Sequence, residues 1–262
     1  MNKLSVVIIT LNEANNIARC IDSVKTIADE IIVLDSFSTD GTAAIALQKG
    51  AIVHQQGFAG YIQQKNKAIK LASNNYVFSI DADEALSDEL ARSICSAKEN
   101  FEYKAYSIHR CNIYCGHHIR HGLWYPDKKL RLFDKRTGYF GGLNPHDKVI
   151  LAQDNYIQHL KGELFHYSYQ SFDEYMLRNE EISTIAAESL FNTNRRVHWS
   201  KIFLSPLWAF INGYFLRLGF LDGQDGFVIA THTANQSYKK YYKLKQLQKN
   251  ATHKIHWQNA EL

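Results

Sequence analysis

Residues 76–84 decide the fold: Tyr76-Val77-Phe78-Ser79-Ile80-Asp81-Ala82-Asp83-Glu84. An apolar run typical of a buried strand ends there in two carboxylates, Asp81 and Asp83. Side chains at positions i and i+2 of an extended segment project on the same side, so the two carboxylates converge if the chain stays extended. Because like charges repel, we expect a cation between them. Mg²⁺ and Mn²⁺ favour oxygen ligands and commonly bridge carboxylates to phosphates, so the stretch predicts a metal that receives a diphosphate at a strand end.

Strand-like and helix-like segments alternate in the part of the chain that leads to this stretch. The expected strands are Leu4–Thr10, Glu30–Asp35, Ala51–His54 and Tyr76–Ile80, and the expected helices are 17–24 (with Asn12 as its cap), Ala43–Gln48 and Gly60–Ala72. Mainly apolar strands rich in β-branched residues are typical of parallel strands buried on both faces. The alternation predicts an α/β fold with a doubly wound, mostly parallel sheet.

The pattern changes after a helix expected at Asp88–Lys98. Three further segments have strand character and are separated by irregular loops, namely Tyr103–Arg110, Lys128–Phe133 and Asp147–Leu151. They predict a small antiparallel part, and Phe172–Phe191 predicts a return to helix. We therefore expect two domains, residues 1–170 with the sheet and residues 171–262 as a helical C-terminal extension.

Polar side chains follow three of the predicted parallel strands at the point where each strand ends. They are Thr10, Asn12 and Glu13 after the first strand, Asp35 after the second, and Asp81 and Asp83 after the fourth. Ligands of open α/β sheets bind outside the carboxyl ends of the strands, so these residues predict one nucleotide cleft. Neither G-x-G-x-x-G nor G-x-x-x-x-G-K-[ST] occurs, which argues against dinucleotide dehydrogenases and P-loop NTPases. A metal is then left to neutralise the phosphates.

Residues 202–221 form an almost wholly apolar and aromatic segment that Pro206, Asn212, Gly213 and Arg217 interrupt. A spanning helix needs about 20 clean apolar residues, so we expect a helix that lies in a membrane interface, with a buried core helix as the alternative. A lysine-rich tail follows. It predicts contact with anionic lipid headgroups or phosphorylated substrate, and a solvated helix is the alternative.

The bulk composition is that of an ordinary globular protein. The chain has 262 residues, of which 45% are hydrophobic and 21% charged, and a formal net charge of +4, too small to require a nucleic-acid partner. Met1-Asn2-Lys3 leads directly into the first strand, so we expect no signal peptide and a cytoplasmic protein. Cys111 and Cys115 have a spacing that zinc could use, but no second ligand pair at short spacing accompanies them.

Four elements in order resemble the inverting glycosyltransferases of family 2, which have the nucleotide-sugar fold called GT-A. They are Ser5–Glu13, Ile32–Thr42, Gln64–Asn66 and Asp81–Glu84. Further motifs resemble the subgroup that builds the lipopolysaccharide inner core, in which a β-1,4-glucosyltransferase adds glucose to a heptose; they are Trp124–Asp127, Leu130–Phe133, Pro145–Asp147 and Gly219–Gly223. The chain departs from that subgroup at Asp147, where members often have Glu, and at Lys65, where many have Arg.

The resemblance implies a role for each candidate site residue. Thr10, Asn12, Glu13, Asp35, Lys65, Asp81 and Arg131 would bind the nucleotide sugar, with Asp35 accepting from the uracil N–H; Asp83, Asp81 and His166 would hold Mg²⁺ or Mn²⁺. Asp147 would be the base that deprotonates the acceptor hydroxyl, with Glu84 as the alternative base. Plainer roles remain open: a turn carboxylate for Asp35, a surface position for Lys65, Arg131 or Asp147, and a structural histidine for His166.

The expected function is metal-dependent, inverting transfer of a hexose, glucose, from a UDP-sugar to a heptose of the lipopolysaccharide or lipooligosaccharide inner core. The enzyme would be peripheral on the inner face of the cytoplasmic membrane. A family 2 enzyme with another donor sugar, or with a capsule or glycolipid acceptor, is the nearest alternative. A haloacid-dehalogenase-type phosphatase would normally have its Asp-x-Asp motif after the first strand rather than the fourth. A membrane scaffold would leave the strand-end carboxylates unexplained.

Overall fold

The computed structural model describes residues 2–143, 146–152, 156–169 and 171–260. The chain divides into two compact units. The described residues within Met1–Ile113, Pro126–Gly142 and His146–Ser168 form the first unit, and those within Tyr114–Tyr125, Leu143–Pro145 and Tyr169–Leu262 form the second. All the candidate site residues lie in the first unit.

The first unit is built on one sheet with the strand order β3-β2-β1-β4-β8-β6-β11-β5. The strands of its parallel part are β1 (Leu4–Thr10), β2 (Glu30–Asp35), β3 (Ile52–Gln55) and β4 (Tyr76–Asp81). The remaining strands are β5 (Glu84–Leu86), β6 (Ala105–Tyr114), β8 (Asp127–Asp134) and β11 (Ile157–Tyr169). Among these, β8 runs antiparallel to β4 and to β6, and β11 antiparallel to β5. The predicted mostly parallel sheet with an antiparallel part is confirmed.

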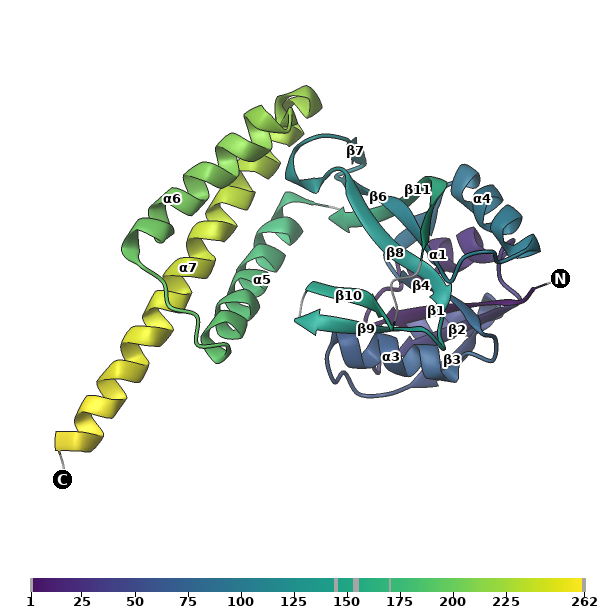
Figure 1. Cartoon of the computed structure of the whole chain (residues 1–262), viewed down its shortest axis with the longest axis horizontal. Coiled ribbons are helices and arrows are strands. Elements are labelled where there is room, and N and C mark those ends of the chain that lie inside the picture. The colour runs from purple at the N-terminus through teal and green to yellow at the C-terminus, as the bar shows by residue number, and fades with distance from the viewer. Residues whose placement is uncertain (1, 144–145, 153–155, 170, 261–262) are drawn as a thin grey trace. The chain divides into compact units, whose positions relative to one another are not determined.

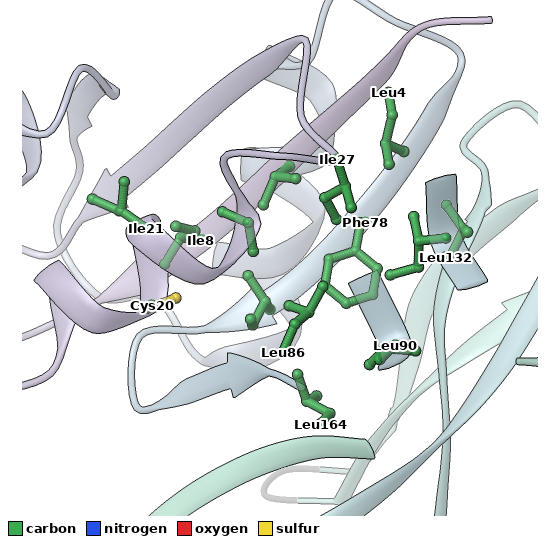
Figure 2. Packing of buried hydrophobic residues seen from close by; sticks show 14 of the residues in the cluster. Leu4, Ile8, Cys20, Ile21, Ile27, Phe78, Leu86, Leu90, Leu132 and Leu164 are labelled. Atoms are coloured by element: carbon green, nitrogen blue, oxygen red, sulfur yellow. The ribbon is translucent and has the colours of Figure 1, made fainter. Parts of the chain in front are cut away.

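Helices cover both faces of this sheet (Figure 1). The helices of the unit are α1 (Ile17–Val24), α2 (Thr42–Gln48), α3 (Tyr61–Leu71) and α4 (Asp88–Glu99). Leu4 and Ile8 of β1 belong to the apolar core that contains α1 and α4, whereas Val7 belongs to the core that contains α3. Successive strand residues point to opposite faces, so one strand serves two cores. Figure 2 shows the first core, in which Phe78 of β4 lies fully buried.

Two further strands lie in the first unit, apart from Leu143 at the end of the first of them. They are β9 (Gly138–Leu143) and β10 (His146–Leu151), which form a separate two-stranded sheet. A glycine is required at position 141 because a Cβ there would lie 2.5 Å from the Ile150 side chain. The missing Cβ therefore lets β9 and β10 pack closely.

The predicted elements up to α4 are confirmed to within one or two residues, whereas the strand predicted at Tyr103–Arg110 extends four residues further, to Tyr114. The predicted cap of the first helix is wrong. Helix α1 begins at Ile17 with Asn16 as its N-cap residue. Asn12 instead has a left-handed backbone with φ of 55°, and its Oδ1 accepts the Thr39 N–H at 2.9 Å. Asn tolerates this conformation better than most residues, so Asn12 turns the chain and ties it to the loop after β2.

The second unit is mainly helical. Besides β7 (His117–Ile119) and the short 3₁₀ turn η1 (Gly122–Trp124), it contains α5 (Phe172–Asn192), α6 (Trp199–Phe210), the π-helix η2 (Ile211–Leu216), the 3₁₀ turn η3 (Gly219–Asp222) and α7 (Gly223–Ala260). Helices α5 and α6 both pack along α7 (Figure 1). The apolar segment 202–221 is therefore split between three elements. Within the described residues, no helix is both long and apolar enough to span a bilayer.

Candidate active site

The ends of β1, β2 and β4 bring the predicted polar residues to one edge of the sheet. In the strand register, Thr10 lies opposite Asp35, and Ile9 lies opposite Asp81. The Oγ1 of Thr10 is buried and has no hydrogen-bond partner among the described residues. A buried hydroxyl without a partner is destabilising, and a ligand group at this edge would satisfy it.

Asp35 is fully buried and already has several donors. Its carboxylate accepts the Ser38 N–H at 3.0 Å, the Ser38 hydroxyl, and the Gln55 Nε2 at 3.2 Å. A carboxylate offers about four acceptor positions, so these donors leave room for one more. Asp35 thus has a role in the turn and still has one acceptor position for a ligand.

The loop after β1 and the turn after β2 are joined by hydrogen bonds. The N–H of Asn12 donates to Ser38 Oγ at 2.8 Å, and the N–H of Glu13 donates to Thr42 Oγ1 at 2.8 Å. The Glu13 carboxylate accepts the Asn16 side-chain amide at 2.7 Å. These bonds hold two strand-end loops in one fixed arrangement, which is what a preorganised nucleotide site requires.

A chain of ion pairs runs from Lys65 through the strand end. The Lys65 ammonium, on α3, lies 3.1 Å from Asp81 Oδ1 and 3.0 Å from Asp147 Oδ2. The Arg131 guanidinium, on β8, lies 2.9 Å from Asp81 and 2.9 Å from Glu84. Burial by itself raises the pKa of Asp81, but the charges on Lys65 and Arg131 outweigh it, and the pKa is lowered far below its usual range. Asp81 is therefore ionised and held between two cations.

Glu84 lies at the centre of this group of ion pairs and has a structural role. It is fully buried, its Oε1 lies 3.4 Å from Arg110 as well as beside Arg131, and its Oε2 accepts the Asp81 N–H at 2.9 Å. A carboxylate held on both oxygens inside the protein has no access to an acceptor sugar. Glu84 instead fixes the turn that begins at Asp81, so the alternative base is not supported.

Replacing Glu84 by alanine is expected to destabilise the protein by about 3–5 kcal/mol, because two arginines would be left buried without their shared anion. Urea unfolding followed by circular dichroism measures this loss. Glu89→Ala, at an exposed position on α4, is the matched control and should change the free energy of unfolding by less than about 0.5 kcal/mol. Equal stability of the two variants would contradict the role given to Glu84.

Asp83 and His166 face each other beyond the end of β4. The distance from Asp83 Oδ2 to His166 Nε2 is 3.2 Å, and the Tyr167 N–H donates to the Asp83 carbonyl at 2.9 Å. The other ring nitrogen, Nδ1, lies 2.7 Å from Asn112 Oδ1, which can only accept. In the neutral ring Nδ1 therefore has the proton, and Nε2 points a lone pair at the Asp83 carboxylate.

This pair has the donor chemistry of a divalent metal site. Two acceptors 3.2 Å apart repel unless the ring is protonated or a cation lies between them. Mg²⁺ commonly takes one or two protein side chains and completes its shell with substrate phosphates and water. Within the described ranges, no group of three or more His, Cys, Asp or Glu side chains converges as a metal site. In this arrangement Asp81 is paired with Lys65 and Arg131, and the expectation that it also shares a metal with Asp83 and His166 stays a prediction.

Asp147, the expected base, reaches the site on β10. Its position depends on α3, where the Asn66 side-chain amide pairs with the backbone of Phe140 on β9, at 2.8 Å and 2.9 Å. The same helix supplies Lys65, which contacts Asp147. Pro145, part of the motif that predicted this region, lies outside the described residues.

Two residues of the site were missed by the sequence analysis. Asn112 on β6 and Ser168 on β11 both contact His166, with Ser168 Oγ 2.9 Å from His166 Nδ1. His166 and Ser168 stand two residues apart on a strand and so share one face, which is a signal that the sequence contains. The pairing of β11 with β6 is not visible in the sequence.

Comparison with known proteins shows the family of this chain. The family model described as Glycosyl transferase family 2 matches residues 5–150. This chain belongs to glycosyltransferase family 2. Uncharacterized glycosyltransferase RP128 of Rickettsia prowazekii (strain Madrid E) is 34% identical over 257 residues, which cover 94% of this chain and 88% of the relative.

One further relative and one solved structure match this glycosyltransferase over most of its length. Lipopolysaccharide core biosynthesis glycosyltransferase LpsC of Rhizobium meliloti (strain 1021) is 28% identical over 253 residues, which cover 91% of this chain and 93% of LpsC. The crystal structure of S. aureus TarS 1-349 in complex with UDP-GlcNAc aligns with a TM-score of 0.50 and 16% identity, covering 95% of this chain and 92% of TarS. The likeness to TarS concerns the fold, and the predicted GT-A architecture is confirmed.

Proposed function

We propose that this glycosyltransferase moves glucose from UDP-glucose to a heptose of the lipopolysaccharide or lipooligosaccharide inner core, with inversion and with Mg²⁺ or Mn²⁺. The observation on which the proposal mainly rests is the Asp83–His166 pair, 3.2 Å apart at the carboxyl edge of the sheet. Similarity to LpsC, whose name assigns it to lipopolysaccharide core biosynthesis, supports the acceptor class. TarS was crystallised with UDP-GlcNAc, which is consistent with a UDP-sugar donor.

The nucleoside would bind along the ends of β1 and β2. Thr10 Oγ1 has no partner there within the described part of the chain, and Asp35 has one acceptor position left for the uracil N–H. Asn12 and Glu13 would shape the nucleoside pocket through the loop that their backbone bonds hold. Lys65, Asp81 and Arg131 would lie next to the ribose and diphosphate.

Asp83 and His166 would hold the divalent ion. A bound divalent ion supplies charge stabilisation to the leaving diphosphate. His166 Nε2 and Asp83 Oδ2 provide one nitrogen and one oxygen ligand, and Asn112 keeps the ring in the tautomer that leaves Nε2 unprotonated. Further ligands would come from the diphosphate and from water.

Asp147 would act as the general base of inverting transfer, taking the proton from the acceptor hydroxyl as that oxygen attacks the anomeric carbon. In the free protein its carboxylate is paired with Lys65 at 3.0 Å. Lys65 also contacts Asp81, so an arriving diphosphate would offer the same ammonium a third anion. Movement of Lys65 toward the diphosphate would release Asp147 for the proton transfer.

The acceptor in this proposal is part of a lipid, so we place the enzyme at the inner face of the cytoplasmic membrane. A donor screen tests the function directly. Release of UDP is measured for each nucleotide sugar, with and without a heptose-containing lipid acceptor, in the presence of Mg²⁺ or Mn²⁺. We expect acceptor-dependent release from UDP-glucose. Faster release from another nucleotide sugar, or transfer only to a glycolipid without heptose, would contradict the proposed donor or acceptor.

Replacing Asn112 by leucine is expected to weaken Mn²⁺ binding about 10–100-fold, because residues that orient a metal-bound histidine typically contribute that much. Leucine has a similar size and cannot accept the Nδ1 proton, so the ring loses the Asn112 contact that fixes its tautomer and keeps only that of Ser168 Oγ among the contacts described above. Electron paramagnetic resonance of free Mn²⁺, titrated in the presence of UDP, measures the affinity. Asn74→Leu, at a position whose amide contacts Ser5 away from the site, is the control. Unchanged Mn²⁺ affinity in the Asn112 variant would contradict the role given to Asn112.

A further inference from the structure

The apolar segment of the second unit leaves an unusual number of large side chains in solvent. Eleven of them, in residues 199–227, are between 44% and 62% exposed, namely Trp199, Phe203, Leu204, Leu207, Trp208, Phe215, Leu216, Leu218, Phe220, Leu221 and Phe227. We call these residues the apolar surface. Isolated exposed apolar residues are normal on a soluble protein, whereas a connected group of this size marks an interaction site.

The members of the apolar surface are connected. Phe203, Leu204, Leu207 and Trp208 recur at a spacing of four residues and share one side of α6. Phe215, Phe220 and Phe227 come together around Tyr214, with ring centroids 5.1, 6.2 and 5.6 Å from it. The surface therefore continues from α6 through η2 and η3 to the start of α7.

Glycines hold this part of the unit in a tight arrangement. A Cβ at Gly226 would lie 1.8 Å from the Gly219 carbonyl oxygen, and a Cβ at Gly219 would lie 2.6 Å from the Gly213 carbonyl oxygen. The backbone of η2, η3 and α7 consequently packs without side chains between its layers. Leu218, between η2 and η3, has a left-handed backbone with φ of 58° and is nevertheless exposed. A strained backbone that presents leucine to solvent indicates a function rather than internal packing.

The exposed charges along the apolar surface are mainly positive. From Trp199 to Leu221 the chain contains Lys201 and Arg217, both exposed, and no Asp or Glu. The two carboxylates before Phe227 are engaged within the unit: Asp222 accepts the His121 N–H at 2.9 Å, and Asp225 Oδ2 lies 2.7 Å from His117 Nδ1. Aromatic and aliphatic side chains mixed with Lys or Arg are typical of segments that lie in the interface of an anionic bilayer.

A second copy of the chain fits the apolar surface less well than a lipid bilayer does. A symmetric contact would place the same surface on both sides, so Lys201 and Arg217 of each copy would meet, while the nearby carboxylates Asp222 and Asp225 are already engaged by His121 and His117. Anionic lipid headgroups supply the missing negative charge.

We propose that the apolar surface inserts into the headgroup and upper acyl region of an anionic phospholipid bilayer, with Lys201 and Arg217 at the headgroup level. This inference rests on the proposed function in one respect: membrane binding would bring the enzyme to an acceptor that is part of a lipid. The binding itself does not depend on the reaction.

Vesicle co-sedimentation tests this proposal with the whole protein. Vesicles of equimolar phosphatidylglycerol and phosphatidylcholine are compared with vesicles of phosphatidylcholine alone. We expect the wild type to bind the anionic vesicles. The double variant Leu207→Gln/Leu216→Gln should lose at least about tenfold in partition coefficient, because two leucine side chains that would enter the bilayer are replaced by polar ones. Leu47→Gln, at a similarly exposed leucine on α2, should bind as the wild type does. Arg217→Glu should weaken binding to the anionic vesicles at low salt and have less effect at high salt.

Three outcomes would overturn the proposal: no binding of the wild type to either vesicle, equal binding of the double variant and the wild type, or a wild-type dimer in analytical ultracentrifugation that the double variant converts to monomer. Circular dichroism checks that the variants fold. UDP binding in the presence of Mn²⁺ is measured in parallel, because it should be unchanged in these variants. Loss of vesicle binding with intact UDP binding separates this inference from the proposed function.

Discussion

Replacing Asp83 by alanine is expected to abolish the metal-dependent part of UDP binding and to lower turnover by at least about a thousandfold, since stabilisation of the leaving diphosphate by a metal contributes several kcal/mol. Asp83 lies 3.2 Å from His166, and in this pair it is the residue that offers the metal an oxygen ligand. Asparagine at position 83 should retain a small part of the binding, because its amide oxygen is a weaker, uncharged ligand.

Isothermal titration of UDP, with Mn²⁺ and with the metal chelated, measures this effect. Asp88→Ala is the matched control, because Asp88 is an exposed carboxylate in the first turn of α4 and lies outside the site. Fold integrity is checked by the unfolding midpoint. If the wild type bound UDP equally well without metal, or if the Asp83 variant kept the metal-dependent increment, the metal site proposed at Asp83 and His166 would be rejected.

Replacing Asp147 by asparagine is expected to lower kcat by about 10²–10⁴, the range that a general base contributes, and to leave UDP binding within a few-fold of the wild type. Asparagine has nearly the same shape and can still accept a hydrogen bond from Lys65, so the position of α3 relative to β10 should not change. What is lost is the carboxylate that accepts the proton.

Asp147→Glu distinguishes loss of the base from loss of shape. Glutamate keeps the carboxylate but has a longer reach, so we expect partial turnover, well above that of the asparagine variant. Single-turnover kinetics with saturating donor report the chemical step, and titration with UDP reports binding. Near-normal turnover of Asp147→Asn would remove Asp147 as the base.

The parallel half of the fold could be predicted because its information is local. Runs such as Leu4–Thr10 and Glu30–Asp35 are buried on both faces, and only parallel strands between helices give such runs. The strand ends then predicted a cleft, and the register of Thr10 with Asp35 agrees. The antiparallel half was harder to predict, because β11 is long and only partly buried, and polar and apolar residues alternate only weakly along it.

The details of the site could not be predicted because they depend on distant residues. The spacing of Asp81 and Asp83 predicted one shared ion. In the structure the chain turns directly after β4, so that Asp81 pairs with Lys65 and Arg131 while Asp83 lies beside His166. Asp83 meets a histidine 83 residues away, and Asp147 meets a lysine 82 residues away. Nothing local encodes such contacts. The apolar segment was likewise ambiguous, since Ile202 is buried while its neighbour Phe203 is exposed.

The Lys65 bridge has a consequence for the kinetic order of the enzyme. While its ammonium holds Asp147, a water molecule or an acceptor that arrives first meets a carboxylate already engaged by a cation. On the proposed mechanism, Asp147 becomes available only after the diphosphate of the nucleotide sugar has drawn Lys65 away. We therefore expect an ordered reaction in which the nucleotide sugar binds before the acceptor, and initial-rate kinetics would show this order.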